Sequence, residues 1–160
     1  MLNLRLNLTL LFLLIAPLLI LAQTDEVILT GKISSDEFKN PWAIEWLENK
    51  QNYVPDSLLI ERLKKVLVGK SVKLTVYLAT WCEDSKMHVP ALLKIAEILN
   101  LDVDYICVNR KKECPLPNCE TWDVLYVPTF VVTSNGTELK RIIETPEQSV
   151  EADLLKMLTN

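Results

Sequence analysis

The stretch from Val72 to Pro90, VKLTVYLATWCEDSKMHVP, predicts a buried strand that runs directly into a helix. Its first half is an almost unbroken apolar run rich in β-branched residues, which is typical of a strand covered on both faces. Acidic and hydroxyl residues then suit the first turn of a helix, and apolar residues recur at helical spacing from Met87 onward. We therefore expect an α/β protein with Cys82 at the joint between a strand and a helix.

The position of Cys82 predicts a reactive thiol. A sulfur at this joint lies beside unpaired helix N–H groups and the positive end of the helix dipole, and both favour the thiolate. We expect further support from a hydrogen bond donated by the Ser85 hydroxyl. Glu83 and Asp84 oppose the thiolate through like charge, and Lys86 partly offsets them.

Length and composition fit one domain with a single core, since the chain has 160 residues and 49% of them are hydrophobic. The net charge is −4 at pH 7, which argues against nucleic acid as a partner. One basic triplet, Arg110-Lys111-Lys112, is followed at once by Glu113, and we expect it to be a solvated loop.

Residues 1–22 have the pattern of a secretory signal peptide, with Arg5 near the start, an apolar run and a cleavage point at Ala22-Gln23. The alternative is an uncleaved membrane anchor, because the uncharged run from Leu6 to Thr24 could just span a thin bilayer. In both cases the folded part is expected outside the cytoplasm, in the periplasm, in the cell envelope or secreted. Disulfides are permitted there.

The chain before and after the central stretch divides into further elements. An apolar–polar alternation predicts an accessory strand within residues 25–35, and a helix is expected from Pro55 to Val68. Trp42 and Trp46 should share a helical face and cover an exposed part of the core, although a ligand platform is the alternative. The apolar run Val103–Asn109 predicts a second strand, parallel to the first and beside it.

The motif W-C-x-x-S-K-M-x-x-P, from Trp81 to Pro90, resembles the active-site segment of the thioredoxin superfamily, W-C-x-x-C followed by a proline-kinked helix. The second landmark of that family is a cis-proline loop facing the active cysteine, and Tyr126–Phe130 around Pro128 is similar to it. The third is a β-hairpin followed by a C-terminal helix, and the matching segments are Phe130–Ser134, Glu138–Ile143 and Ser149–Leu158.

The resemblance implies a thioredoxin fold, which is an α/β fold with a central mixed β-sheet flanked by helices. The thioredoxin-like domain would be residues 55–160, preceded by an N-terminal extension at residues 23–54. The serine version of the motif with a long lead-in is similar to secreted thioredoxin-like proteins of bacterial envelopes. By this resemblance the catalytic residues are Cys82 and Ser85, and the substrate-binding residues are Trp81, Val127 and Pro128.

Two positions depart from the family pattern. Ser85 stands where the family has its resolving cysteine, and Val76 stands where thioredoxins have a buried acid that accepts a proton. The resemblance therefore supports the fold more strongly than it supports ordinary dithiol activity.

The other three cysteines are Cys107, Cys114 and Cys119. Cys107 lies within the second strand and is expected to be a buried, inert thiol. Cys114 and Cys119 enclose a turn-rich loop at the same sheet edge as Cys82. They form either a structural disulfide or a pair that resolves a mixed disulfide at Cys82. A zinc site would need two more ligands and the chain has one histidine, His88, so we expect no metal and no other cofactor.

Two functions remain open. The first is a thiol–disulfide oxidoreductase or isomerase of the single-cysteine type, in which Cys82 forms mixed disulfides with protein thiols or small thiols. The second is a non-catalytic thioredoxin-like module that holds partner proteins in a groove between Cys82 and Pro128. If Pro128 is cis, the Val127 backbone would be exposed beside Cys82, where an extended substrate segment could add as a strand. The membrane would be a partner only through an uncleaved N-terminal segment.

Overall fold

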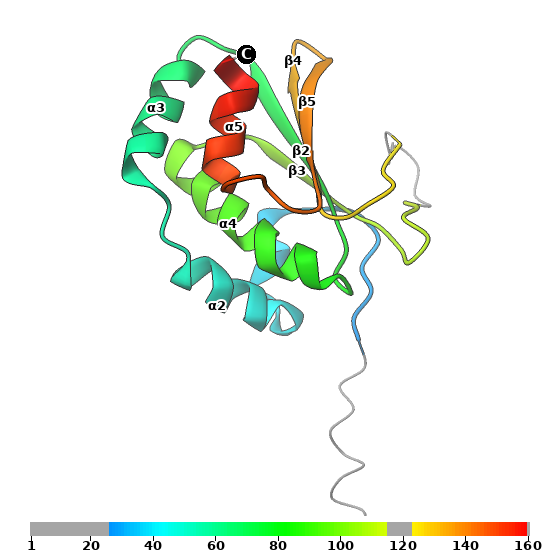
Figure 1. Ribbon diagram of the computed structural model, residues 1–160. Helices are drawn as coiled ribbons and strands as arrows, with labels where there is room; N and C mark the ends of the chain where they lie inside the picture. The colour runs from blue at the N-terminus through cyan, green and yellow to red at the C-terminus, as the bar shows by residue number, and fades with distance from the viewer. Residues whose placement is uncertain (1–25, 115–122, 160) are drawn as a thin grey trace, which may run out of the picture.

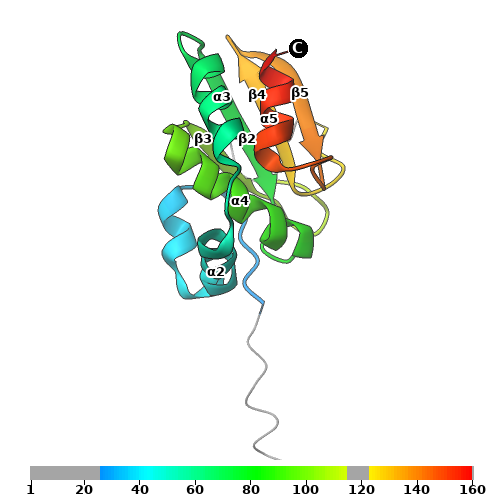
Figure 2. The same ribbon diagram turned by 60° about the vertical axis from the view of Figure 1, so that its left-hand side comes forward.

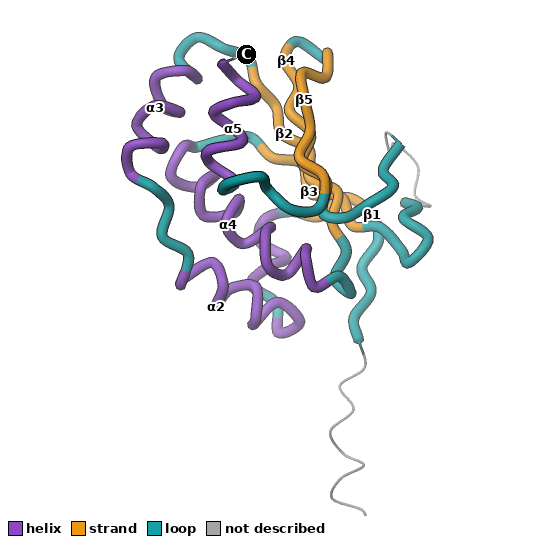
Figure 3. Tube along the Cα trace, in the orientation of Figure 1, coloured by secondary structure: helices purple, strands orange, loops and turns teal. Residues whose placement is uncertain are grey.

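Five strands form one mixed β-sheet in this computed structural model, which describes residues 26–114 and 123–159. The strand order is β1-β3-β2-β4-β5, with β2 at the centre (Figures 1 and 3). The bounds are β1 (Gly31–Ile33), β2 (Val72–Leu78), β3 (Val103–Cys107), β4 (Thr129–Ser134) and β5 (Thr137–Ile143). On one side of β2, β3 runs parallel, as the helical crossover predicts; on the other side β4 runs antiparallel.

The α-helices of the described residues pack on one face of this sheet, as Figures 1 and 2 show from two directions. They are α2 (Ile44–Asn52), α3 (Ser57–Leu67), α4 (Glu83–Leu99) and α5 (Val150–Thr159). The Asp56 carboxylate caps α3 by accepting hydrogen bonds from the amides of Leu58 and Leu59. The mixed sheet with its packed helices confirms the predicted α/β thioredoxin fold.

The central strand is buried on both faces, as its sequence predicts. Leu74, Val76 and Leu78 point to the helices and belong to the main apolar core. Because successive side chains of a strand point to opposite faces, Tyr77 points the other way, as does Ala79 just beyond the strand's end. These two belong to a second apolar cluster with Val108, Val124, Val127 and Val131, and Trp81, Cys82 and Cys114 pack against it.

The turn between β4 and β5 is the short hairpin that the sequence predicts. Asn135 and Gly136 both have positive φ, at 52° and 78°. Asn-Gly suits this backbone because glycine has no Cβ and asparagine tolerates the left-handed region. Residues 123–125, which precede the Pro128 turn, are irregular.

The N-terminal region contributes to the same sheet and core. β1 pairs antiparallel with β3, within the range where the sequence predicts an accessory strand. After it come two short 3₁₀ turns, η3 (Ser35–Lys39) and η4 (Pro41–Ala43). Phe38 and Trp46 are each 2% exposed and their ring centroids lie 5.5 Å apart, while Trp42 is partly buried against the same core. The expectation that Trp42 and Trp46 cover the core is confirmed.

The predicted leader, residues 1–22, lies outside the described residues. In the two described ranges, no helix combines the length and apolar character that crossing a bilayer requires.

A buried carboxylate joins the C-terminal helix to the segment between α2 and α3. Glu151 is 2% exposed, and its two oxygens accept hydrogen bonds from the Tyr53 hydroxyl at 2.6 Å and from the Asp56 amide at 3.0 Å. Burial opposes ionisation, but these hydrogen bonds prevail and hold the pKa of Glu151 below its usual value. Burial and the neighbouring carboxylate raise the pKa of Tyr53, so its hydroxyl keeps the proton that it donates.

Replacing this carboxylate should lower stability in a pH-dependent way. Because the pKa of Glu151 is lowered on folding, its contribution is present above the unfolded pKa and is lost as pH falls through the folded pKa. We expect Glu151→Gln to lower the free energy of unfolding by about 2 kcal/mol at pH 7. The deficit should shrink below about pH 4.5. Urea unfolding at several pH values measures this difference.

Glu147→Gln is the matched control, because Glu147 forms an exposed ion pair with Lys156 at 2.7 Å. It should change the free energy of unfolding by less than about 1 kcal/mol. A Glu151→Gln deficit that stays constant down to pH 3 would contradict the assignment of a stabilising ionised carboxylate.

Candidate active site

Cys82 is the N-cap residue of α4, at the edge of the sheet where β2 ends. Its amide donates to the Ala79 carbonyl at 3.1 Å, and its own carbonyl accepts the first hydrogen bond of α4, from the Lys86 amide at 3.1 Å. The side chain makes no capping hydrogen bond to the helix. The predicted joint is therefore confirmed, and the sulfur lies beside the first-turn amides, which have no acceptor within the helix.

The Cys82 sulfur faces the loop that leads into β4. Its thiol donates a hydrogen bond to the Val127 carbonyl at 3.1 Å, and the Val127–Pro128 peptide bond is cis. The side chain is half-buried and forms no disulfide. The expected cis-proline loop is therefore found facing the cysteine. A carbonyl accepts from a thiol but repels a thiolate, so this contact belongs to the protonated form.

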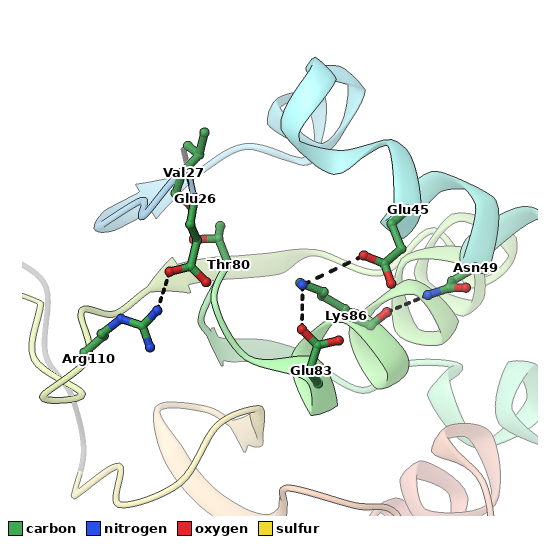
Figure 4. Close-up of polar contacts among 8 residues, drawn as sticks. All are labelled: Glu26, Val27, Glu45, Asn49, Thr80, Glu83, Lys86 and Arg110. Carbon is green, nitrogen blue, oxygen red and sulfur yellow. Dashed lines mark hydrogen bonds and ion pairs between the residues drawn. The ribbon is translucent and has the colours of Figure 1, made fainter. Parts of the chain in front are cut away.

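Trp81 forms one side of the site and is held from two directions. Its indole N–H donates to the Val108 carbonyl at 3.3 Å, and the guanidinium of Arg110 lies 5.2 Å from its ring centroid. Arg110 also forms an ion pair with Glu26, shown in Figure 4. The sequence suggested only a solvated loop for Arg110, and neither contact has a local sequence signal, because Glu26 and Trp81 lie far from Arg110 along the chain.

Ser85 is fully buried, at 0% exposure, in the first turn of α4. Its hydroxyl oxygen accepts a hydrogen bond from the Ala79 amide at 3.3 Å, which ties the helix to the chain just beyond β2. The hydrogen bond expected from Ser85 to the Cys82 sulfur is not among those of the described residues. Ser85 thus occupies the resolving position of the motif in a supporting role.

Lys86 follows the acidic first turn and neutralises part of it. Its ammonium forms ion pairs with Glu83 at 2.6 Å and with Glu45 of α2 at 3.8 Å (Figure 4). The Glu83 contact raises the pKa of Lys86, so the amine remains charged. The expected offset between Lys86 and the first-turn acids is therefore present, with Glu45 as an additional partner that the motif itself does not reveal.

The remaining titratable side chains near the site are poor candidates for direct chemistry. His88 is half-buried, and burial lowers its pKa. Cys107 is 0% exposed, and burial raises its pKa to about 12, which confirms the expectation of an inert thiol. Cys114 is disulfide-bonded, while Cys119 lies outside the described residues. Among the described residues, no group of three or more histidine, cysteine or acidic side chains could hold a metal ion.

The two free cysteines among the described residues, Cys82 and Cys107, should differ sharply in their alkylation. Iodoacetamide at pH 8 should label Cys82 in the folded protein, whereas Cys107 should stay unlabelled until the protein is unfolded, because its thiol is buried and un-ionised. Peptide mass spectrometry of labelled native and urea-unfolded samples measures both sites. Equal labelling of the two cysteines in the native protein would contradict the buried position of Cys107.

Several known proteins are similar to this chain. A family model described as thioredoxin matches residues 40–156. Thioredoxin H2 of Arabidopsis thaliana is 31% identical over an alignment of 93 residues, and the match covers 56% of this chain and 67% of that protein. A solved structure of a protein of unknown function from Pseudomonas aeruginosa is 21% identical, with a TM-score of 0.49 over 79% of this chain and 80% of that chain. A solved HIV epitope scaffold is also 21% identical, with a TM-score of 0.48 over 79% of this chain and 76% of that chain.

The family match spans both landmarks of the site, the Trp81-Cys82 segment and the Pro128 loop. It also includes Ser85 in place of a second motif cysteine, so the site has one thiol within the motif. On the strength of the match over residues 40–156, the chain belongs to the thioredoxin family.

Proposed function

We propose that this protein is an extracytoplasmic thiol–disulfide oxidoreductase of the single-cysteine type, in which Cys82 forms mixed disulfides with protein or low-molecular-weight thiols. Membership of the thioredoxin family indicates thiol–disulfide redox chemistry. The observation that carries the proposal is the free, half-buried sulfur of Cys82, 3.1 Å from the Val127 carbonyl and beside cis-Pro128.

The first chemical step consumes the Cys82 thiolate. The thiol loses its proton to water, and the thiolate attacks one sulfur of a substrate disulfide. A new bond forms between Cys82 and that sulfur, the substrate S–S bond breaks, and the other substrate sulfur leaves as a thiolate. Cys82 is oxidised and the leaving sulfur is reduced, so electrons balance without a cofactor.

Loss of the thiol proton also frees a substrate-binding group. The Val127 carbonyl accepts from the Cys82 thiol in the resting protein, and that hydrogen bond ends when the sulfur ionises or enters a mixed disulfide. The carbonyl can then accept an N–H from an extended substrate segment lying along the Pro128 loop. The thiolate in turn can accept from the first-turn amides of α4, which Cys82 leaves uncapped.

Release of the substrate needs a thiol from outside the motif, because Ser85 has no sulfur. A second thiolate attacks the mixed disulfide at the substrate sulfur, forms a disulfide with the substrate and returns Cys82 as a thiolate. This chemistry suits isomerisation, or exchange between single thiols, better than net oxidation. Cys114 is already disulfide-bonded, and in that state it supplies no attacking thiol; we propose a structural link with Cys119.

Placement outside the cytoplasm is part of the proposal. The apolar leader at residues 1–22 supports export, either with cleavage or as an anchor. The disulfide at Cys114 supports an oxidising compartment, because such links are rare in cytosolic proteins.

A second candidate is a non-catalytic module that holds partner proteins in the groove between Cys82 and Pro128. Two observations favour it: Ser85 is buried and supports the backbone, and Val76 is fully buried where thioredoxins have a proton-accepting acid. In this function Cys82 contacts the partner protein without forming a covalent bond, and no covalent adduct accumulates.

Covalent trapping separates the two functions. The full chain is expressed in an envelope-containing host and its adducts are compared on non-reducing gels for wild type, Cys82→Ala and Cys107→Ala. We expect wild-type adducts that disappear on reduction and are lost in Cys82→Ala. Cys107→Ala should keep them, because that sulfur is buried.

Adducts that persist unchanged in Cys82→Ala would exclude the oxidoreductase proposal. If Cys82→Ala still retains the same partners without any covalent link, the binding module is the correct reading. Disulfide mapping of the wild-type sample tests the role of the loop cysteines, since a Cys82 link to Cys114 or Cys119 would show that they resolve the adduct.

A further inference from the structure

We infer that the N-terminal region clamps the segment from Thr80 to Lys86 at both ends and thereby positions Cys82 for reaction. The inference deepens the proposed function, on which it rests, by assigning positioning roles to Asn49 and Thr80. Figure 4 shows the contact from Asn49 of α2 to Lys86 and draws Thr80 close to Val27.

The first end of the clamp satisfies a carbonyl that Pro90 leaves without a partner. In an α-helix the carbonyl of residue 86 accepts from the amide of residue 90, but proline has no amide hydrogen. In α4 the side-chain amide of Asn49 donates to the Lys86 carbonyl at 3.1 Å. A residue from α2 therefore replaces the hydrogen bond that the proline kink removes.

This contact and the first hydrogen bond of α4 meet at the same residue, Lys86. The Cys82 carbonyl accepts from the Lys86 amide, and the carbonyl of Lys86 accepts from Asn49. Lys86 is therefore held on two sides, by the first turn of α4 through its amide and by α2 through its carbonyl. The first turn of α4, with the amides that a thiolate would use, is thus held through Asn49.

The helix that carries Asn49 is itself fixed. Trp46 is 2% exposed in the main core, and Glu45 one residue earlier reaches the Lys86 ammonium at 3.8 Å. α2 therefore contacts Lys86 twice: Asn49 binds the Lys86 carbonyl, and Glu45 pairs with the Lys86 ammonium.

The second end of the clamp is Thr80, two residues before Cys82. Its hydroxyl donates to the Val27 carbonyl at 2.5 Å and accepts from the Leu29 amide at 3.3 Å, and Thr80 is 6% exposed. The Thr80 hydroxyl thus donates to one backbone group and accepts from another, as the backbone of a paired strand would do. It fixes the chain just beyond β2 to the segment that leads into β1.

Between these two ends the active sulfur has little freedom to change its distance from Val127 or from the first-turn amides. The thiolate is favoured only when those amides point at the sulfur. Removing either end should therefore make Cys82 less reactive, even though neither Asn49 nor Thr80 is in the described contacts of the sulfur.

The test is the pH profile of Cys82 alkylation by iodoacetamide, followed peptide by peptide in the full chain. Asn49→Ala removes the donor and Thr80→Val removes the hydroxyl with little change in shape. We expect each to lower the alkylation rate at pH 7 about fivefold and to move the midpoint of the profile to higher pH. Asn49→Gln, which keeps an amide donor, should restore part of the rate.

Asn52→Ala and Thr75→Val are the matched controls. Asn52 is an exposed residue of the same helix, and Thr75 is a half-buried residue of β2. Both should keep the wild-type profile. Thermal unfolding of every variant shows whether it is folded at the temperature of the assay. If Asn49→Ala is not folded there, Asn49→Ser takes its place.

A folded Asn49→Ala or Thr80→Val protein with the wild-type pH profile would overturn the inference, whether or not its thermal stability has fallen. The result is independent of the trapping experiment, because alkylation needs no substrate. An unchanged profile with Cys82-dependent adducts rejects the clamp alone, whereas a shifted profile without such adducts rejects the proposed function alone.

Discussion

The burial of β2 between β3 and β4 is the constraint on which the site depends. β2 is covered on both faces, so its register with both neighbours is strongly specified. In that register Tyr77 lies opposite Thr129, the first residue of β4. The end of β2 and the start of β4 therefore meet at one edge of the sheet, and the sulfur of Cys82 lies beside the Val127 carbonyl as a result.

This edge gives a single thiol two alternative sets of partners. As a thiol, Cys82 donates to Val127; as a thiolate, it would need the amides at the start of α4. Both sets of partners are backbone groups. The carbonyl that binds the thiol is held by the loop into β4, and the amides that would bind the thiolate are held by α4. In the proposed mechanism the thiol proton goes to water, because Val76 stands where thioredoxins have a buried acid that accepts it.

The N-terminal region shares its sheet and its apolar core with the rest of the domain. β1 adds to the sheet beside β3, Trp46 fills the core, and Tyr53 donates to the buried Glu151 of α5. Hydrogen bonds from this region reach the chain on both sides of Cys82. A segment that looks like a lead-in along the sequence is thus part of the support of the site.

The sequence alone determined the order of the elements, the buried central strand, the Cys82 joint and the proline loop, because each depends on local periodicity, helix-terminal residues or a short motif. The sequence also marked Cys107 as a buried thiol. It did not indicate that the Ser85 hydroxyl would turn to Ala79, that Arg110 would stack on Trp81, or which group would satisfy the carbonyl freed by Pro90. Only the tertiary structure decided these contacts, because each joins residues whose neighbourhood is set by how helices and loops pack on the sheet and not by their spacing along the chain.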